Sequence, residues 1–326
     1  MRKVVVAGAG AFGTAMAVRL AANPDNAVTI HTIIPEVADE INASHTNARY
    51  VPSVTLPESI SATTEDAVFS EAQAVFLAIP AKHIVSFAQG IRPFVEGEPL
   101  VVNLAKGMSA RGAFITQDIP FSRSASLKGP SFAAEVVRGL PTALTFGGAR
   151  RDYAFLKDDV LAGTGFELDY CADVRAVELC SVLKNIYAIA VGIATGRYDS
   201  KNIDFMVLSM AAREMRAILK LYSCDEEALY CYCGLGDLGL TALTDLSRNR
   251  TYGFLLGKGF TLDPGANGEM TVEGHRNADV LHAEITALGV ESDFKLLSAL
   301  YSFLYENSNL EAFLKRILPK AAKTRP

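Results

Sequence analysis

The stretch KVVVAGAGAFGTAMAVRL, residues 3–20, constrains the fold more than any other part of the chain. An apolar, β-branched run is followed directly by Gly8, Gly10 and Gly13 in a G-x-G-x-x-G pattern, and then by residues with helical periodicity. In such a turn the backbone can approach a pyrophosphate closely, and the phosphates lie on the helix N-terminus. The stretch therefore predicts a Rossmann-type dinucleotide-binding fold at the start of the chain.

The first half of the chain alternates apolar runs with helical patterns, which is typical of a parallel sheet covered by helices on both faces. Further runs that predict strands are AVTIHT, AVFLAIP, LVVNLAKG, SASLKG, TALTFGG and FELDY. After about Cys171 the periodicity is helical, at 174–195, 203–222, 248–256, 276–288 and 293–317. We therefore expect an α/β fold in which a Rossmann-type doubly wound sheet, residues 1–173, precedes an all-α domain, residues 174–326.

The composition excludes several classes of protein. Hydrophobic residues make up 50% of the 326 residues, charged residues 21%, and the net charge is −5, which fits a globular protein without a basic surface for nucleic acid. The N-terminus lacks a signal-peptide pattern, and no uninterrupted apolar run reaches membrane-spanning length. The five cysteines are odd in number and form no C-x-x-C pair. We therefore expect a reducing cytoplasm and no metal.

One lysine interrupts the apolar helical stretch ELCSVLKNIYAIAVG, residues 178–192. No rotation of this helix gives Lys184 a solvated face, and a buried ammonium is costly unless it is paired or has a function. Asp237, among glycines and leucines in GLGDLGLT, would be equally costly without a cation or donor nearby. Our hypothesis is that Lys184 exchanges a proton with a substrate oxygen during hydride transfer. The alternative is an ammonium that reaches the surface by snorkelling.

Three segments offer groups that could bind an anion. Gly129-Pro130-Ser131 is predicted to begin a helix with free N–H groups, and Lys106 follows an apolar strand at the edge where doubly wound sheets bind ligands. Ser247-Arg248-Asn249 is predicted to begin another helix, with a hydroxyl, a guanidinium and an amide. The alternatives are a well-terminated helix, an exposed loop lysine and a serine cap beside solvated arginines.

Taken together, these blocks resemble the NAD(P)-dependent glycerol-3-phosphate dehydrogenases of bacteria and archaea. They occur in family order between residues 8 and 277, as GAGAFGTA, NARYVP, LAKG, KGPSFAAEVVRGLPTA, ELCSVLKNIYAIAVG, GLGDLGLT, SRNRTYGFLLGKG and TVEGHRN. The resemblance implies hydride transfer that interconverts dihydroxyacetone phosphate and sn-glycerol 3-phosphate, for phospholipid synthesis. It also implies a homodimer that binds a small phosphorylated three-carbon substrate. The composition adds the expectation of a cytoplasmic protein with no nucleic-acid partner and no membrane insertion.

The resemblance also implies roles for individual residues. Lys184 matches the family's catalytic lysine. The positions that match its substrate site, besides Lys184, are Lys106, Gly129, Ser131, Asp237, Ser247, Arg248 and Asn249. The positions that match its dinucleotide site, besides Gly8, Gly10 and Gly13, are Ala11, Phe12, Tyr50, Lys106, Ala133, Arg248 and Glu273.

Three segments depart from the family pattern, and one of them is Ser209-Met210-Ala211, which stands where the family often has T-R-G. GRYDSKNIDF stands where the family has G-F-G-A-N-A-R, and keeps little beyond Asn202. After AVTIH come Thr32, Ile33 and Ile34. They include neither the acidic residue typical of NAD sites nor the arginine typical of NADP sites, so either NAD or NADP could be the cofactor. Two other functions are open as well, namely a related Rossmann dehydrogenase acting on another hydroxy acid or acyl substrate, and a non-catalytic dinucleotide sensor.

Overall fold

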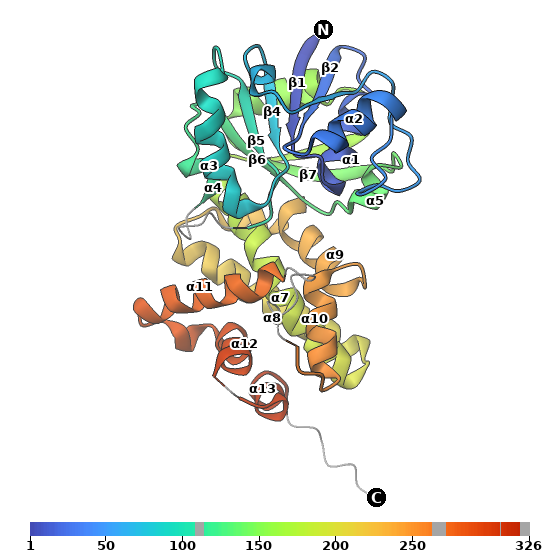
Figure 1. The fold of residues 1–326 in the computed structure, drawn as a ribbon. Coiled ribbons are helices and arrows are strands. Elements are labelled where there is room, and N and C mark those ends of the chain that lie inside the picture. Colours follow the sequence, from blue (N-terminus) through green and yellow to red (C-terminus); the bar gives the residue numbers. More distant parts are fainter. Residues whose placement is uncertain (108–113, 263–271, 307, 320–326) are drawn as a thin grey trace, which may run out of the picture. The chain divides into compact units, whose positions relative to one another are not determined.

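The computed structural model describes residues 1–107, 114–262, 272–306 and 308–319. The chain folds into two compact units (Figure 1). The first unit is Met1–Leu179 with Tyr230–Cys233, and the second is Cys180–Leu229 with Gly234–Pro326. The first unit contains the sheet and the second contains helices, which confirms the expected fold class. A domain boundary at residue 174 stays a prediction.

The sheet of the first unit has eight strands in the order β3-β2-β1-β4-β5-β6-β7-β8. The strands are β1 (Arg2–Ala7), β2 (Asn26–His31), β3 (Ser61–Thr63), β4 (Ala74–Leu77), β5 (Leu100–Asn103), β6 (Ser124–Lys128), β7 (Thr142–Gly147) and β8 (Phe166–Cys171). β1 to β6 are parallel, but β7 pairs antiparallel with β6, and β8 follows the direction of β7. The expectation of a parallel sheet is therefore wrong for the last two strands. A parallel return usually needs a crossover helix, and between β6 and β7 the chain forms only a four-residue helix.

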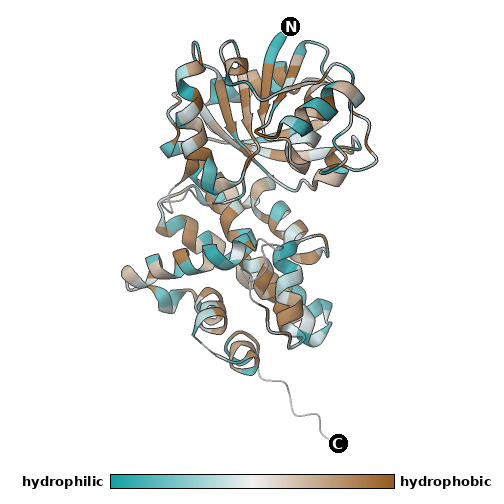
Figure 2. Ribbon diagram, in the orientation of Figure 1, coloured by the Kyte–Doolittle hydropathy of each residue, from teal (hydrophilic) through white to brown (hydrophobic). Residues whose placement is uncertain are grey.

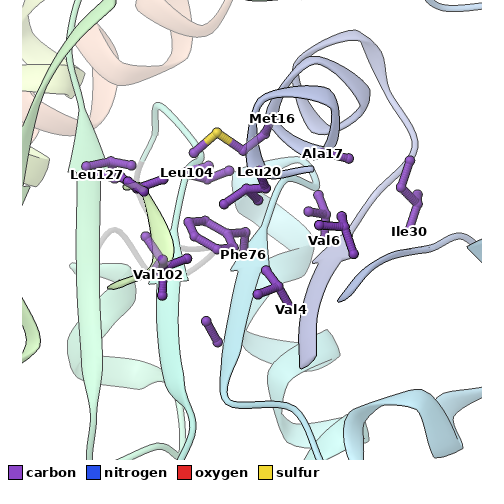
Figure 3. Close-up of a cluster of buried hydrophobic side chains, with 14 of the residues drawn as sticks. Val4, Val6, Met16, Ala17, Leu20, Ile30, Phe76, Val102, Leu104 and Leu127 are labelled. Carbon is purple, nitrogen blue, oxygen red and sulfur yellow. The ribbon is translucent and has the colours of Figure 1, made fainter. Parts of the chain in front are cut away.

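Helices cover both faces of the sheet, as alternate residues of β1 show. Val4 and Val6 pack in one core cluster with Met16 of the first helix (Figure 3). Val5 packs in a second cluster with Ile84. The strands are accordingly hydrophobic along most of their length (Figure 2), as strands buried on both faces must be. The helices of this unit are α1 (Ala11–Leu20), α2 (Pro35–Ser44), α3 (Ala81–Ile91), α4 (Ile115–Asp118), α5 (Ala133–Val136) and α6 (Arg150–Ala154), with short turns at η1 (Asp66–Phe69), η2 (Arg92–Phe94) and η3 (Phe155–Val160).

The long helix α7 (Val174–Tyr198) begins in the first unit and continues as the core of the second. By length and composition alone it could cross a membrane, but its whole apolar window is buried in the folded chain. The other helices of the second unit are α8 (Lys201–Leu221), α9 (Asp237–Leu243), α10 (Arg248–Gly257), α11 (Glu273–Ala287), α12 (Lys295–Tyr305) and α13 (Leu310–Ile317), with short turns at η4 (Glu226–Tyr230), η5 (Tyr232–Gly236) and η6 (Glu291–Asp293).

The helices of the second unit differ from the expectation in two places. The helix predicted over 293–317 is broken into α12 and α13, because the side chain of Asn309 accepts a hydrogen bond from the backbone N–H of Ala312 and so begins a new helix. The other difference is α9, which the sequence analysis did not predict because Gly234 and Gly236 precede it closely and Gly239 lies inside it.

Helices α7 and α10 touch backbone to backbone through glycines. A Cβ at Gly192 would lie 2.3 Å from a carbonyl oxygen of α10, and one at Gly253 would lie 2.1 Å from a carbonyl oxygen of α7. Gly196 and Gly257 repeat this contact one turn further along. Because the obstacles are backbone atoms, no change of rotamer can relieve them. Only glycine permits the backbones of α7 and α10 to lie this close together. The glycines therefore determine the position of α10 relative to α7.

Glu214 of α8 joins three helices through one carboxylate. It accepts hydrogen bonds from the N–H groups of Leu296 (2.6 Å) and Leu297 (3.0 Å) at the start of α12, and from the hydroxyl of Tyr187 (2.9 Å) on α7. Helix α12 has no side-chain cap of its own, so Glu214 satisfies N–H groups that a helix start leaves open. Tyr187 is fully buried, and its hydroxyl donates to this carboxylate.

Replacing Glu214 by alanine should lower the free energy of unfolding by about 2–4 kcal/mol, because buried donors on two helices lose their acceptor. Glu214→Gln keeps one oxygen that can accept a hydrogen bond, so it should lower the free energy of unfolding less than Glu214→Ala does. Glu311→Ala removes an exposed carboxylate that pairs with Lys315, and should cost under about 1 kcal/mol. Urea unfolding followed by circular dichroism measures all three. Equal effects of Glu214→Ala and Glu311→Ala would contradict the bridging role.

Candidate functional site

A buried ion pair lies in the second unit. The Nζ atom of Lys184 on α7 is 2.5 Å from Oδ1 of Asp237, the first residue of α9, and the two side chains are 2% and 1% exposed. The expected burial of both charges is confirmed, and the lysine does not reach the surface. Such a pair offsets the cost of desolvation only when its geometry is good and further hydrogen bonds assist it.

Thr241 supplies a further hydrogen bond to this pair. The ammonium of Lys184 donates to Oγ1 of Thr241 at 3.1 Å, and the same hydroxyl lies 3.4 Å from Oδ1 of Asp237. The sequence analysis missed Thr241. Its signal was the spacing of four residues from Asp237, which places two side chains on one face of a helix. The three side chains form an assembled cluster of acid, base and hydroxyl.

The start of α10 matches the expectation from the sequence. Ser247 is the N-cap, and its hydroxyl oxygen accepts a hydrogen bond from the N–H of Arg250 at 3.3 Å. A hydroxyl that accepts in this way can still donate its own proton. Arg248 is exposed, whereas Arg250 is buried and pairs with Asp245. The exposed guanidinium at the start of a ten-residue helix is suited to binding an anion.

The start of α11 is joined to both α7 and α10. Oδ1 of Asn249 accepts a hydrogen bond from the N–H of Gly274 at 2.9 Å, and Nδ2 of Asn185 donates to Oε2 of Glu273 at 3.3 Å. A Cβ at Gly274 would lie 2.2 Å from the carbonyl oxygen of Asn185, so the contact is a backbone contact as well. The sequence analysis missed Asn185, although it follows Lys184 directly. The second unit thus brings the candidate residues of α7, α9, α10 and α11 together.

In the first unit, the glycine turn leads from β1 into α1. Gly8 has a φ of +115°, and a Cβ there would lie 2.6 Å from the carbonyl oxygen of Ala78. A Cβ at Gly13 would lie 2.0 Å from the carbonyl oxygen of Gly8. Gly10 differs, because a Cβ there would meet nothing within 4 Å, and it begins α1 without a side-chain cap. The fold itself requires Gly8 and Gly13, whereas Gly10 keeps space open at the helix N-terminus, which fits a bound pyrophosphate.

A cavity of about 640 Å³ lies at this turn. Gly8, Gly10 and Tyr50, all predicted to touch the dinucleotide, line it together with the end of β2 and the start of α3. Its volume lies in the range of cofactor sites. Ala11 is the first residue of α1. Phe12 and Ala133 do not line this cavity, but both pack on one small apolar cluster.

Lys106, Gly129 and Ser131 meet at the carboxyl ends of β5 and β6. The carbonyl oxygen of Gly129 accepts hydrogen bonds from Nζ of Lys106 at 3.3 Å and from Oγ of Ser131 at 3.0 Å. The prediction that this segment begins a helix is wrong, because α5 begins only at Ala133 and has four residues. Gly129 has a φ of +157°, and the residue before Pro130 is pushed out of the helical region.

A buried network supports the loop that carries Lys106. Oε1 of Glu178 accepts hydrogen bonds from Nδ2 of Asn103 and from Oγ of Ser126, each at 2.7 Å. Nζ of Lys128 donates to the backbone oxygen of Asn103 at 2.7 Å, and Oδ1 of Asn103 accepts from the N–H that precedes Lys106. The sequence analysis missed this network. Its signal was Glu178, a second charge in the apolar stretch of α7.

Comparison with known proteins places these features in a family. A family model described as NAD-dependent glycerol-3-phosphate dehydrogenase N-terminus matches residues 3–154, and one described as its C-terminus matches residues 173–315. A glycerol-3-phosphate dehydrogenase [NAD(P)+] of Methanothermobacter thermautotrophicus is 32% identical over 98% of both chains. One of Zymomonas mobilis is 34% identical over 98% of this chain and 93% of the relative.

Solved structures agree with the sequence comparisons. Glycerol-3-phosphate dehydrogenase of Coxiella burnetii is 26% identical, covers 96% of this chain and 98% of its own, and superposes with a TM-score of 0.85. A ketopantoate reductase of Ralstonia solanacearum shares the fold alone, with 14% identity, coverage of 93% of this chain and 99% of its own, and a TM-score of 0.55. The chain belongs to the NAD-dependent glycerol-3-phosphate dehydrogenase family.

Proposed function

We infer that the protein interconverts dihydroxyacetone phosphate and sn-glycerol 3-phosphate with NAD(P)H, and so supplies glycerol phosphate for phospholipid synthesis. The observation that carries this function is the buried cluster of Lys184, Asp237 and Thr241, in which an ammonium is held by a carboxylate and a hydroxyl. A ketone that accepts hydride needs such a proton donor at its oxygen. Family membership supplies the substrate class.

Lys184 acts as the acid in the reduction. NAD(P)H, when bound, supplies the hydride that reaches C2 of the ketone. Lys184 donates a proton to the C2 oxygen, on which negative charge develops, and the neutral amine takes a proton back in the reverse direction. Asp237 keeps the ammonium charged before the reaction, since a neighbouring anion favours the charged form. Thr241 holds the ammonium in position.

The dinucleotide is bound by the first unit at the glycine turn. The open space above Gly10 and the N–H groups at the start of α1 support this assignment. The residues proposed to touch it are Gly8, Gly10, Ala11, Phe12, Gly13, Tyr50, Lys106, Ala133, Arg248 and Glu273. In this proposal residues 1–173 form the dinucleotide domain and residues 174–326 the substrate domain.

The substrate phosphate is bound by cations and by small polar groups. Arg248 supplies a guanidinium, and Ser247 and Asn249 supply a hydroxyl and an amide at the start of α10. Lys106, Gly129 and Ser131, which share one carbonyl oxygen, complete the set of proposed substrate contacts. The protein is further proposed to be a cytoplasmic homodimer. The odd number of cysteines and the absence of a C-x-x-C pair from the sequence support a reducing compartment.

Purified protein should reduce dihydroxyacetone phosphate but not dihydroxyacetone, because the sites at Arg248 and Lys106 require a phosphate. Dinucleotide absorbance at 340 nm measures the rate with NADH and NADPH in parallel. A hydroxy acid or an acyl thioester used faster than the phosphate ester would favour a related dehydrogenase. Dinucleotide binding without turnover of any substrate would favour the non-catalytic sensor.

Replacing Lys184 by alanine should lower kcat by at least about a hundredfold, which is the contribution typical of a positioned acid, and should leave the Kd for NADH within about threefold. Lys315→Ala, at an exposed lysine paired with Glu311, is the control and should leave kcat unchanged. Lys184→Ala also removes the ammonium that offsets the buried charge of Asp237, so Lys184→Ala/Asp237→Ala is measured as well. A small primary amine in the buffer should restore part of the rate. Near-normal turnover of either variant would contradict the role of Lys184.

Gly10→Ala should fold normally and bind NADH at least about tenfold more weakly, because the added methyl group occupies open space that the pyrophosphate needs. Gly13→Ala should instead prevent stable folding, since its Cβ would clash with a backbone oxygen. Gly90→Ala on α3 is the matched control, because its Cβ also meets nothing within 4 Å but lies away from the cavity lining. Thermal melts and calorimetric titration with NADH distinguish the three variants. Normal NADH affinity in Gly10→Ala would be the contrary result.

A further inference from the structure

We propose that the protein takes NADH in preference to NADPH, and that Ile33 sets this preference. The proposal rests on the proposed function and concerns the end of the 640 Å³ cavity that lies after β2. In Rossmann-type folds this end meets the adenosine ribose, where a carboxylate selects a free 2′-hydroxyl and an arginine accommodates a 2′-phosphate. Here Ile33, which is 84% exposed, lines the cavity at this place.

Cationic side chains do not line this cavity. Among the described residues that form its wall there is no lysine or arginine, and the titratable members are His31, Tyr50 and His83. His31 is buried, its Nε2 lies 3.0 Å from Asp66, and burial lowers its pKa. It is therefore largely neutral near pH 7.5 and already has a partner. A 2′-phosphate carries nearly two negative charges and would lose water here without gaining a guanidinium.

The start of α2 adds no anion site to replace the missing arginine. Pro35 at its first position has no N–H, and the N–H groups of Val37 and Ala38 both donate to the backbone oxygen of Ile34. Glu36 places a carboxylate in the first turn, which opposes a second anion. A helix start that would normally attract a phosphate is thus reduced in donors and carries the same charge as the phosphate.

The rest of the wall suits an uncharged ligand end. Ile34, Ile79, Pro80 and Phe87 present apolar surface to the cavity, which favours an adenine ring and an unmodified ribose. Arg49 is exposed, and its guanidinium lies 5.4 Å from the centroid of the ring of Tyr50, which lines the cavity. Arg49 is therefore the side chain that an experiment must test as a rival determinant.

The experiment measures Kd and kcat/KM for NADH and NADPH at pH 8. The chain has no tryptophan, so binding is followed by nicotinamide fluorescence or calorimetry. We expect NADH to bind at least about tenfold more tightly than NADPH. Ile33→Arg should lower the Kd for NADPH at least about tenfold, because one hydrogen bond to a charged group contributes about this much affinity. The same change should alter the Kd for NADH less than about threefold. Ile33→Ser, which shortens the side chain without adding charge, is the matched control and should leave NADPH weak.

Three results would overturn the proposal. The first is that the unaltered protein binds NADPH as tightly as NADH or more tightly. The second is that Arg49→Ala loses the affinity for NADPH, which would make Arg49 the determinant. The third is a gain for NADPH in Ile33→Ser as large as in Ile33→Arg. Because binding is measured without substrate, a clear NADH preference in a protein that does not reduce dihydroxyacetone phosphate would refute the proposed function and leave the preference intact.

Discussion

The backbone contact between α7 and α10 is the constraint on which the site of the second unit depends. α7 carries Lys184 and the start of α10 carries Ser247 to Asn249, and the glycines of the two helices fix their distance. Each glycine costs a helix about 1 kcal/mol relative to alanine, so four of them in two helices oppose helix formation. The close approach compensates for this loss, and it allows Asn249 to reach the start of α11.

Both units hold buried charges in place with dedicated hydrogen bonds. Lys184 and Asp237 are accompanied by Thr241, and Glu178 by Asn103 and Ser126. A charge held in this way has its orientation set before a ligand arrives. Electrostatic groups that need no reorganisation during the reaction are the ones that contribute most to catalysis. The polar interior therefore serves positioning more than stability, since buried ion pairs add little net stability.

Local patterns predicted the features that depend on local causes. The glycine turn, the apolar strands and the burial of Lys184 and Asp237 follow from the residues beside them. The direction of β7, the late start of α5 and the partners of Glu178 do not, because they depend on which distant segments pack together. Thr241 lies between these cases. Its spacing of four residues from Asp237 can be read from the sequence. That spacing places the two side chains on one face only if the segment is helical, and the nearby glycines argued against a helix.

The short return of Tyr230–Cys233 to the first unit determines how the protein can be divided. Within that unit the N–H of Tyr232 donates to Asp169 at 2.9 Å, and the N–H of Cys233 donates to Thr145 at 2.8 Å. The chain thus leaves the first unit, comes back to it and leaves again. No single cleavage point separates the two units, and an amino-terminal fragment would lack the segment that donates hydrogen bonds to side chains of β7 and β8. A single recombination event between two relatives would therefore not exchange one whole unit. The first unit would receive Tyr230–Cys233 from one parent and its sheet from the other.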